Sequence, residues 1–254
     1  VPHYLSGIIL NQGDRIMIDK MVGKTEVALY GLAYSIGMLV QLFISGMNSA
    51  LTPWMYSKIK KGDIRSMRKV LQLLSVVVVG IAVALMLISP ELVLIFGSPK
   101  YREAVYVIPP VAASVFFIFI YNILSMPQFY YEKTQFLMAA SMAAAGANVV
   151  LNFIFIRLFG YIAAGYTTLA CYMLYSVGHY IVSKRILVNE GIQENLMSPG
   201  FLVACSAFLI GASIICNLIF PYRILRYAIL LASAGLVFWK KELLLKTMAD
   251  IRKK

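Results

Sequence analysis

The stretch VLQLLSVVVVGIAVALMLISP, from Val70 to Pro90, runs for 21 residues without a charged side chain. A helix of that length can cross a hydrocarbon core about 30 Å thick. Residues 200–220 form a second uncharged run of 21 residues. Neither run alternates between polar and apolar residues as a barrel strand does, and a backbone in lipid must satisfy its own polar groups. The two runs therefore predict an all-α membrane protein.

The composition of the whole chain supports this class. Hydrophobic residues make up 61% of the 254 residues, charged residues 13%, and the mean hydropathy is +0.80. Soluble domains carry about 25% charged residues. Charged, proline and glycine residues divide the chain into about eight candidate spans. We expect a polytopic transmembrane helix bundle with spans at roughly 3–20, 27–56, 70–97, 104–130, 135–157, 161–183, 200–220 and 224–240.

Basic residues are unevenly divided between the two ends of the predicted bundle. One set of loops and the C-terminal tail carry 15 of the 23 Lys and Arg residues, and the opposite set carries seven. The positive-inside rule therefore predicts a multi-pass protein of the cytoplasmic (inner) membrane with a cytoplasmic C-terminus. The net charge of +12 lies at span ends, where anionic lipid headgroups explain it, so no nucleic-acid partner is expected. Near the last span, Arg223 and Arg226 are expected to extend to the membrane interface.

Catalytic and metal-binding patterns are missing from the sequence. We find no GxSxG, HExxH or P-loop motif, so the chain is not expected to be an enzyme or to hydrolyse ATP. Cys171, Cys205 and Cys216 fall within apolar spans without a CxxC spacing or a histidine cluster. They are interpreted as small packed residues, and we expect neither a metal nor a cofactor.

The first span, within SGIILNQGDRIMIDKMVG at 6–23, contains an adjacent acid and base, Asp14 and Arg15. A charge near the middle of a bilayer costs about 2.5–3.5 kcal/mol, so such residues usually face a protein interior or water. On a helical wheel, one face carries His3, Gly7, Asn11 and Asp14, with Arg15 at its edge. Two interpretations remain open. The charges line a transport pathway, or they form a structural ion pair or lie near the outer interface.

Polar stripes also follow other predicted helices. The second span carries Tyr30, Tyr34, Gln41, Ser45, Asn48 and Thr52 on one face. The fourth, fifth and sixth carry Ser114, Tyr121, Ser125, Gln128 and Glu132, then Ser141, Asn148 and Asn152, then Thr168, Tyr172, Tyr175 and His179. Hydrogen bonds between helices explain one or two such residues, whereas whole stripes favour a water-filled cavity. His179 is interpreted as a packed residue rather than a proton relay.

The cavity hypothesis selects ten residues. Arg15 is the candidate contact for a phosphate, and Asp14 is its partner or an ion-coupling group. Amide and phenol groups suit the hydroxyls of a sugar. The full set of pathway candidates is Asp14, Arg15, Asn11, Tyr34, Gln41, Asn48, Tyr121, Gln128, Asn148 and Asn152.

Four segments carry a resemblance to a known family. They are DRIMIDKMVGKTEVALYGLAYSIG at 14–37, NSALTPWMYSKIKKGD at 48–63, FGSPKYREAVYVIPP at 96–110 and NVVLNFIFIRLFGYIAAGYTTLACYML at 148–174. They resemble the second half of bacterial polysaccharide flippases of the Wzx type, within the MOP exporter superfamily. The resemblance covers about residues 1–188, and the last two spans resemble the extra pair that follows the family's twelve-helix core.

The resemblance implies a domain organisation and a function. Residues 1–188 would form the second six-helix lobe, and residues 189–254 would form a linker, two further spans and a basic tail. Such proteins move polyprenyl-diphosphate-linked oligosaccharide across the membrane by alternating access, and here an ion gradient is expected to drive the cycle. Asp14 and Arg15 match the DR of the family's first helix in this lobe and would line its cavity.

Several partners follow from the same resemblance. They are the lipid-linked oligosaccharide, membrane lipids, a missing N-terminal lobe and the polysaccharide polymerase machinery. Because the chain begins at Val1, we expect it to be part of a longer protein. Two other functions stay open: a multidrug exporter of the same superfamily, and a membrane component of a glycan-assembly complex that transports nothing.

Overall fold

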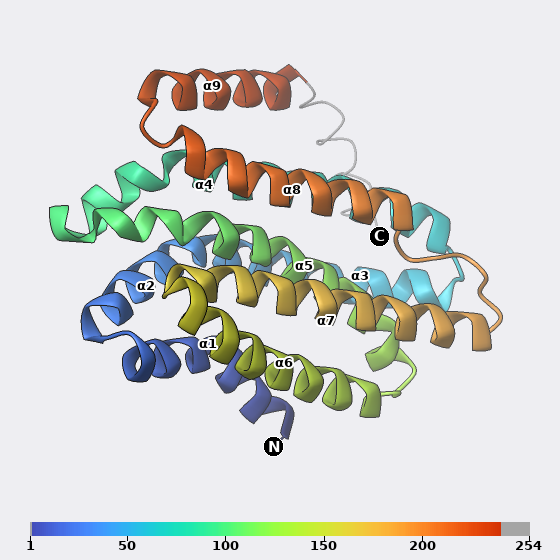
Figure 1. Ribbon diagram of the computed structural model, residues 1–254. Helices are drawn as coiled ribbons and strands as arrows, with labels where there is room; N and C mark the ends of the chain where they lie inside the picture. Colours follow the sequence, from blue (N-terminus) through green and yellow to red (C-terminus); the bar gives the residue numbers. More distant parts are fainter. Residues whose placement is uncertain (1, 240–254) are drawn as a thin grey trace.

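The computed structural model describes the backbone of residues 2–239 and the side chains of residues 12–233 and 235 (Figure 1). All regular secondary structure within this range is helical, which confirms the predicted fold class. The helices are α1 (Pro2–Met21), α2 (Lys24–Gly37), α3 (Leu39–Lys60), α4 (Ile64–Phe96), the 3-10 helix η1 (Pro99–Tyr106), α5 (Ile108–Tyr130), α6 (Gln135–Phe159), α7 (Ile162–Asn189), α8 (Pro199–Ile219) and α9 (Arg223–Trp239).

Helix α5 forms the centre of the bundle. Every residue from Ile108 to Ile120 is buried, because this segment is apolar on all sides and is covered by α3, α4, α7 and α8. Helix α7 approaches it closely at Gly165, where an added Cβ would lie 3.1 Å from Pro110 Cγ. The glycine therefore lets the two helices pack with little space between them.

The predicted second span is interrupted. Instead of one helix over 27–56, the structure has α2 and α3, which meet at Met38. At this break Gly37 packs against α5, since a Cβ on Gly37 would lie 2.6 Å from Val111 Cγ1. The two helices still form one membrane-length segment, Lys24–Lys60. The break is a change within a span and adds no loop.

Within residues 2–239, five segments are long and apolar enough to cross a membrane. They are Lys24–Lys60, Ile64–Phe96, Ile108–Tyr130, Gln135–Phe159 and Pro199–Ile219. The prediction of eight spans also counted α1, α7 and α9, which are helices here but do not meet this criterion. The difference has a physical origin, because α1 and α7 carry many polar side chains and α9 has only 17 residues.

The helix connections gather at two ends of the bundle. We call the "η1 end" the end with η1, the α1–α2 turn, Gly160 and the α8–α9 turn, on the left of Figure 1. The charge distribution predicts that this end faces away from the cytoplasm. At the opposite end the loop before α4 is held by Asp63, which accepts a hydrogen bond from Ser66 N and pairs with Lys58 Nζ at 2.6 Å.

The last two helices pack on one side of the bundle. Helix α8 lies against α4 and α5, and α9 lies against α4 and α8 at the edge of the molecule (Figure 1). The preceding linker contacts α4 through Arg68 Nε, which donates to the Asn195 carbonyl at 2.7 Å. The predicted boundary between residues 188 and 189 falls at the end of α7. The basic tail from residue 240 lies outside the described residues.

Candidate functional site

A fully buried carboxylate lies between four helices near the η1 end. Asp14 of α1 has no exposed surface. Its Oδ2 accepts hydrogen bonds from Tyr30 of α2 at 2.5 Å and from Thr168 of α7 at 2.7 Å. Its Oδ1 accepts from the Asn152 amide of α6 at 2.5 Å. Three helices that are distant in sequence thus converge on one side chain of the fourth.

A second group of polar residues orients Asn152. The Asn152 amide nitrogen also donates to Asn148 Oδ1, one helical turn earlier, at 3.1 Å. The hydroxyl of Thr167 donates to Asn152 Oδ1 and to the Ala164 carbonyl. Asn148 and Asn152 are both fully buried. We call Asp14, Tyr30, Asn148, Asn152, Thr167 and Thr168 the "Asp14 node".

Asp14 and its neighbour Arg15 do not form an ion pair. Among the residues with described side chains, the ion pairs are Lys58–Asp63 and Arg226–Glu91. Arg15 is half-buried; its Nη1 donates to Gln12 Oε1 at 3.2 Å, and its guanidinium lies 5.4 Å from the ring centre of Tyr34. The alternative of an internal Asp14–Arg15 ion pair is therefore not found in this structure. The two side chains point to different surroundings.

The partners of Asp14 suit more than one state of the carboxyl group. An ionised carboxylate is only an acceptor, and the donors from Tyr30, Asn152 and Thr168 satisfy it. A hydroxyl can also accept a hydrogen bond, so Tyr30 or Thr168 could receive one from a protonated carboxyl after rotating its own proton. The carboxyl group can thus keep these hydrogen-bond partners whether or not it carries a proton. A carboxylate in a salt bridge would have to give up its charged partner before it could bind a proton.

An aromatic cluster continues from the Asp14 node along α7. Its members are Tyr121 and Gln128 of α5 and Tyr172, Tyr175 and His179 of α7. Tyr121 stacks on Tyr172 with ring centres 6.3 Å apart and contacts Tyr175 at 4.6 Å. Gln128 Nε2 lies 2.8 Å from His179 Nδ1. Because Thr168 and His179 share one face of α7, the polar interior extends over roughly 16 Å of helix.

Of the other predicted pathway residues, Tyr34 adjoins the node, whereas Gln41 and Asn48 lie on α3. Gln41 and Asn48 are half-buried on α3, and the structure gives neither a hydrogen bond to Asp14. Tyr34 lies beside Tyr30, with ring centres 5.8 Å apart, and carries Arg15 over its ring. The side chain of Asn11 lies outside the described part of the chain.

The sequence-based selection missed three members of the node. Tyr30 and Thr168 lay on the predicted polar stripes but were not chosen, and Thr167 was not considered. Their positions on the polar stripes could have identified both residues; Thr168, for example, shares a face of α7 with Tyr172 and His179. Thr167 carried no such signal, because it lies beside that face and reaches Asn152 of another helix.

The node does not resemble a metal centre built by several charged ligands. In the described part of the chain, no three His, Cys, Asp or Glu residues lie close enough to hold a metal ion together. Asp14 instead has neutral oxygen and nitrogen partners. Cys171, Cys205 and Cys216 are free thiols.

Fold and interior define a polytopic helical membrane protein with a buried carboxylate at a helix junction. Sequence comparison identifies the family: the model of the MatE family matches residues 5–154, and the chain belongs to this family. MatE proteins are membrane transporters of the MOP superfamily rather than enzymes. The match covers α1 to α5 and most of α6, and therefore includes Asp14, Tyr30 and Asn152.

Two relatives come from Haemophilus influenzae. A protein described as "Uncharacterized membrane protein" is 31% identical over 134 residues, covering 50% of this chain and 32% of that protein. One described as "Lsg locus putative protein 1" is 28% identical over 148 residues, covering 55% of this chain and 35% of that protein. The match thus spans about a third of each relative. No solved structure is significantly similar.

Proposed function

We propose that the chain is one lobe of an ion-coupled flippase that moves polyprenyl-diphosphate-linked oligosaccharide across the cytoplasmic membrane for polysaccharide biosynthesis. The MatE family provides the transporter class. The finer proposal rests on two neighbouring groups. Within the described part of the chain, the buried Asp14 has only neutral partners and the half-buried Arg15 has no carboxylate partner. One group serves the coupling ion, and the other serves the anionic substrate.

Asp14 is the proposed coupling group. A carboxylate buried in a membrane protein is costly, so such residues usually mark an ion or proton pathway. Tyr30 and Thr168 stabilise the ionised form and remain compatible with a bound proton or small cation. Because α1, α2, α6 and α7 all contribute to the node, a change of charge at Asp14 would alter the preferred packing of four helices.

Arg15 is the proposed contact for the diphosphate. Its described surroundings offer one hydrogen bond, to Gln12, and the Tyr34 ring. A guanidinium in a membrane segment without a carboxylate needs water or an anionic ligand to balance its charge. Its planar donor geometry suits phosphate oxygens.

The surface of α3 supports a role for a further lobe. Gln41 and Asn48 are half-buried there, and Ser45 and Ser49 are exposed. The two serine hydroxyls donate to carbonyls of their own helix and tolerate lipid, whereas the buried Gln41 Oε1 has no hydrogen-bond partner among the described residues. We propose that this face borders a water-filled cavity closed by an N-terminal lobe, with polysaccharide polymerase machinery as a further partner.

An exporter of small organic cations is the second candidate. The observation that favours it is the aromatic cluster around Tyr121 and Tyr175, since aromatic faces attract cations and Asp14 would supply a negative charge. The unpaired Arg15 argues against a cationic substrate in the same space. We therefore prefer the proposed function as a flippase for lipid-linked oligosaccharide.

A gene-deletion experiment tests the proposal. In a deletion strain we expect polyprenyl-linked oligosaccharide to accumulate in the membrane and surface polysaccharide to disappear. The native protein should restore export, Arg15→Ala should not, and both should reach similar membrane levels. The matched control is Lys20→Ala, which removes an exposed cation from the same helix and should restore export.

Two results would contradict this function. Unchanged glycans with new sensitivity to cationic drugs would favour the exporter. Wild-type export by Arg15→Ala would remove Arg15 from the substrate path. If Arg15→Ala instead lowered the amount of protein in the membrane, Arg15 would have a structural role.

A further inference from the structure

A cavity of about 850 Å³ lies at the η1 end, away from the Asp14 node. It is bounded by the end of α4, by η1 and by the α8–α9 turn. Four basic and two acidic side chains line it, which gives a net of two positive charges. These are Lys100, Arg102, Arg223 and Arg226, with Glu91 and Glu103.

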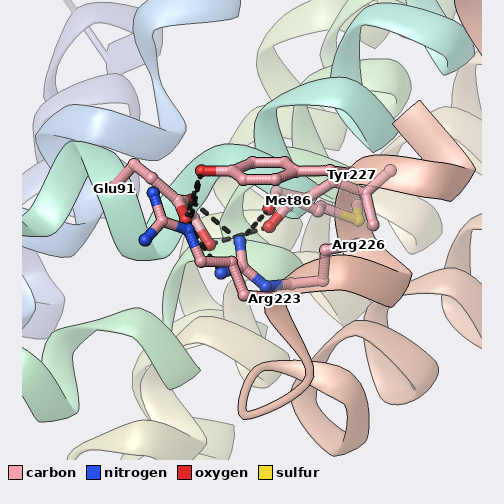
Figure 2. A network of polar contacts seen from close by, with 7 residues as sticks. Met86, Glu91, Arg223, Arg226 and Tyr227 are labelled. Atoms are coloured by element: carbon pink, nitrogen blue, oxygen red, sulfur yellow. Dashed lines mark hydrogen bonds and ion pairs between the residues drawn. The ribbon is translucent and has the colours of Figure 1, made fainter. Parts of the chain in front are cut away.

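One of the four cations is fixed in the wall of the cavity. Arg226 of α9 is 3% exposed and donates through Nη1 and Nη2 to the two carboxylate oxygens of Glu91 of α4, both at 2.8 Å (Figure 2). Its Nη1 also donates to the Leu87 carbonyl at 2.6 Å, and Tyr227 donates to Glu91 at 2.9 Å. The pair ties α9 to α4 and thereby holds Arg223, one turn earlier on α9, at the cavity.

The other three cations have no carboxylate partner in the described part of the chain. Lys100, Arg102 and Arg223 are exposed, and the structure has no ion pair at any of them. Arg223 lies over Tyr227, with its Nε 3.4 Å from the Tyr227 hydroxyl. Among the described residues, the terminal nitrogens of Arg223 have no hydrogen-bond partner. The cavity therefore offers cationic donors from η1 and from α9 that form no ion pair within the described residues.

The remaining wall is apolar. Leu94, Tyr106 and Phe220 line the cavity. Leu94 and Tyr106 are exposed, and Tyr106 packs on the buried Phe220 with ring centres 5.8 Å apart. A small inorganic anion would gain nothing from this surface. An amphiphile with an anionic head and an apolar body would use both the cationic and the apolar parts.

We propose that this cavity binds the phosphate group of a membrane lipid. Arg223 and Lys100 contact the phosphate oxygens, and the upper part of the lipid chain lies against Leu94 and Phe220. Two lipids carry this chemistry: an anionic phospholipid of the bilayer and a polyprenyl diphosphate. Binding of a phospholipid would not depend on the proposed transport function, because the cavity lies outside the Asp14 node.

Lipid binding to the detergent-purified native protein, measured by native mass spectrometry, tests the proposal. The probes are phosphatidylglycerol and the diacylglycerol with the same chains, which lacks the phosphate. We expect phosphatidylglycerol to bind more tightly. The variant Lys100→Gln/Arg223→Gln should bind it about tenfold more weakly. Both side chains are exposed, so the variant should keep the thermal unfolding midpoint of the native protein.

A matched control and a competition experiment complete the test. Arg157→Gln removes an exposed arginine at the same end of the bundle but outside the cavity, and it should bind like the native protein. Equal binding of both probes, or equal losses in the control and the double variant, would overturn the proposal. Displacement of phosphatidylglycerol by lower concentrations of polyprenyl diphosphate would support it and identify the preferred source of the phosphate.

Discussion

Asp14 and Glu91 are two carboxylates of the helical bundle that are stabilised by different kinds of partner. Asp14 is fully buried among neutral donors from α2, α6 and α7. Glu91 has a side chain that is 26% exposed and is paired with both terminal nitrogens of Arg226. The more deeply buried of the two is thus the one without a cation.

The two sites therefore differ in what they can do. Asp14 can change its protonation state, whereas the Glu91–Arg226 pair fixes α9 against α4. Breaking a buried ion pair leaves an uncompensated charge, so Glu91–Arg226 fixes the position of α9 against α4. Neutral hydroxyl and amide partners impose no such requirement on Asp14, because they can serve a charged or a neutralised carboxyl group. A bundle that carries out transport needs both kinds of contact.

The largest effect is expected at the fixed pair. Replacing Glu91→Leu leaves the buried Arg226 charge unpaired and should lower the free energy of unfolding by about 3 kcal/mol. The partial exposure of Glu91 keeps this at the lower end of the usual range. The measurement is thermal unfolding in detergent. The double variant Glu91→Leu/Arg226→Met should recover most of the loss, since it removes both charges.

Glu103→Leu provides the control for this prediction. It removes an exposed acid that lines the same cavity but has no ion pair in the described residues. Equal unfolding midpoints for Glu91→Leu and Glu103→Leu would show that Glu91–Arg226 does not hold α9. The two carboxylate sites would then differ less than their geometry indicates.

The next effect is expected at Asp14 and concerns transport. Asp14→Asn keeps the size of the side chain and much of its hydrogen bonding but removes the charge. Ion-coupled transport should fall about 100-fold, while the unfolding midpoint changes little. Uptake or export is measured in vesicles with an imposed ion gradient. The control is Asp19→Asn, an exposed acid on the same helix; equal rates for both variants would mean that Asp14 does not couple the ion.

The smallest effect is expected at a single partner of Asp14. Thr168→Val removes one of its three hydrogen-bond donors with little change in volume. The free energy of unfolding should fall by about 0.6 kcal/mol, the average for a hydrogen bond between membrane helices. Ser75→Ala is the comparison, because that buried hydroxyl donates to the Leu71 carbonyl of its own helix. A loss at Thr168 above that of Glu91→Leu would reverse the contrast between the two sites.

Much of the helical architecture could be predicted from local patterns. Long uncharged runs indicated membrane helices, and polar stripes indicated which faces of α5, α6 and α7 would turn inward. Gln128, Asn148 and Asn152 are indeed buried. These predictions succeed because helix formation and facial polarity depend on residues within a few turns of each other.

Contacts between distant segments could not be predicted in the same way. Arg226 was expected to extend to the membrane interface, and its ion pair with Glu91, 135 residues earlier, and its burial in the protein were not foreseen. Arg15 was considered as an ion partner of Asp14 because the two are adjacent in sequence. On a helix, neighbours point about 100° apart, so Asp14 meets α2, α6 and α7 instead.

Local sequence patterns were enough to predict a helical membrane protein, the approximate bounds of α1, α6, α8 and α9, and the polar faces along several helices. Local periodicity and hydropathy are enough for these properties. Only the tertiary structure decided that Asp14 is held by neutral partners and Glu91 by a cation. That distinction depends on which helix faces meet, and the meeting faces are set by packing between segments far apart in the chain.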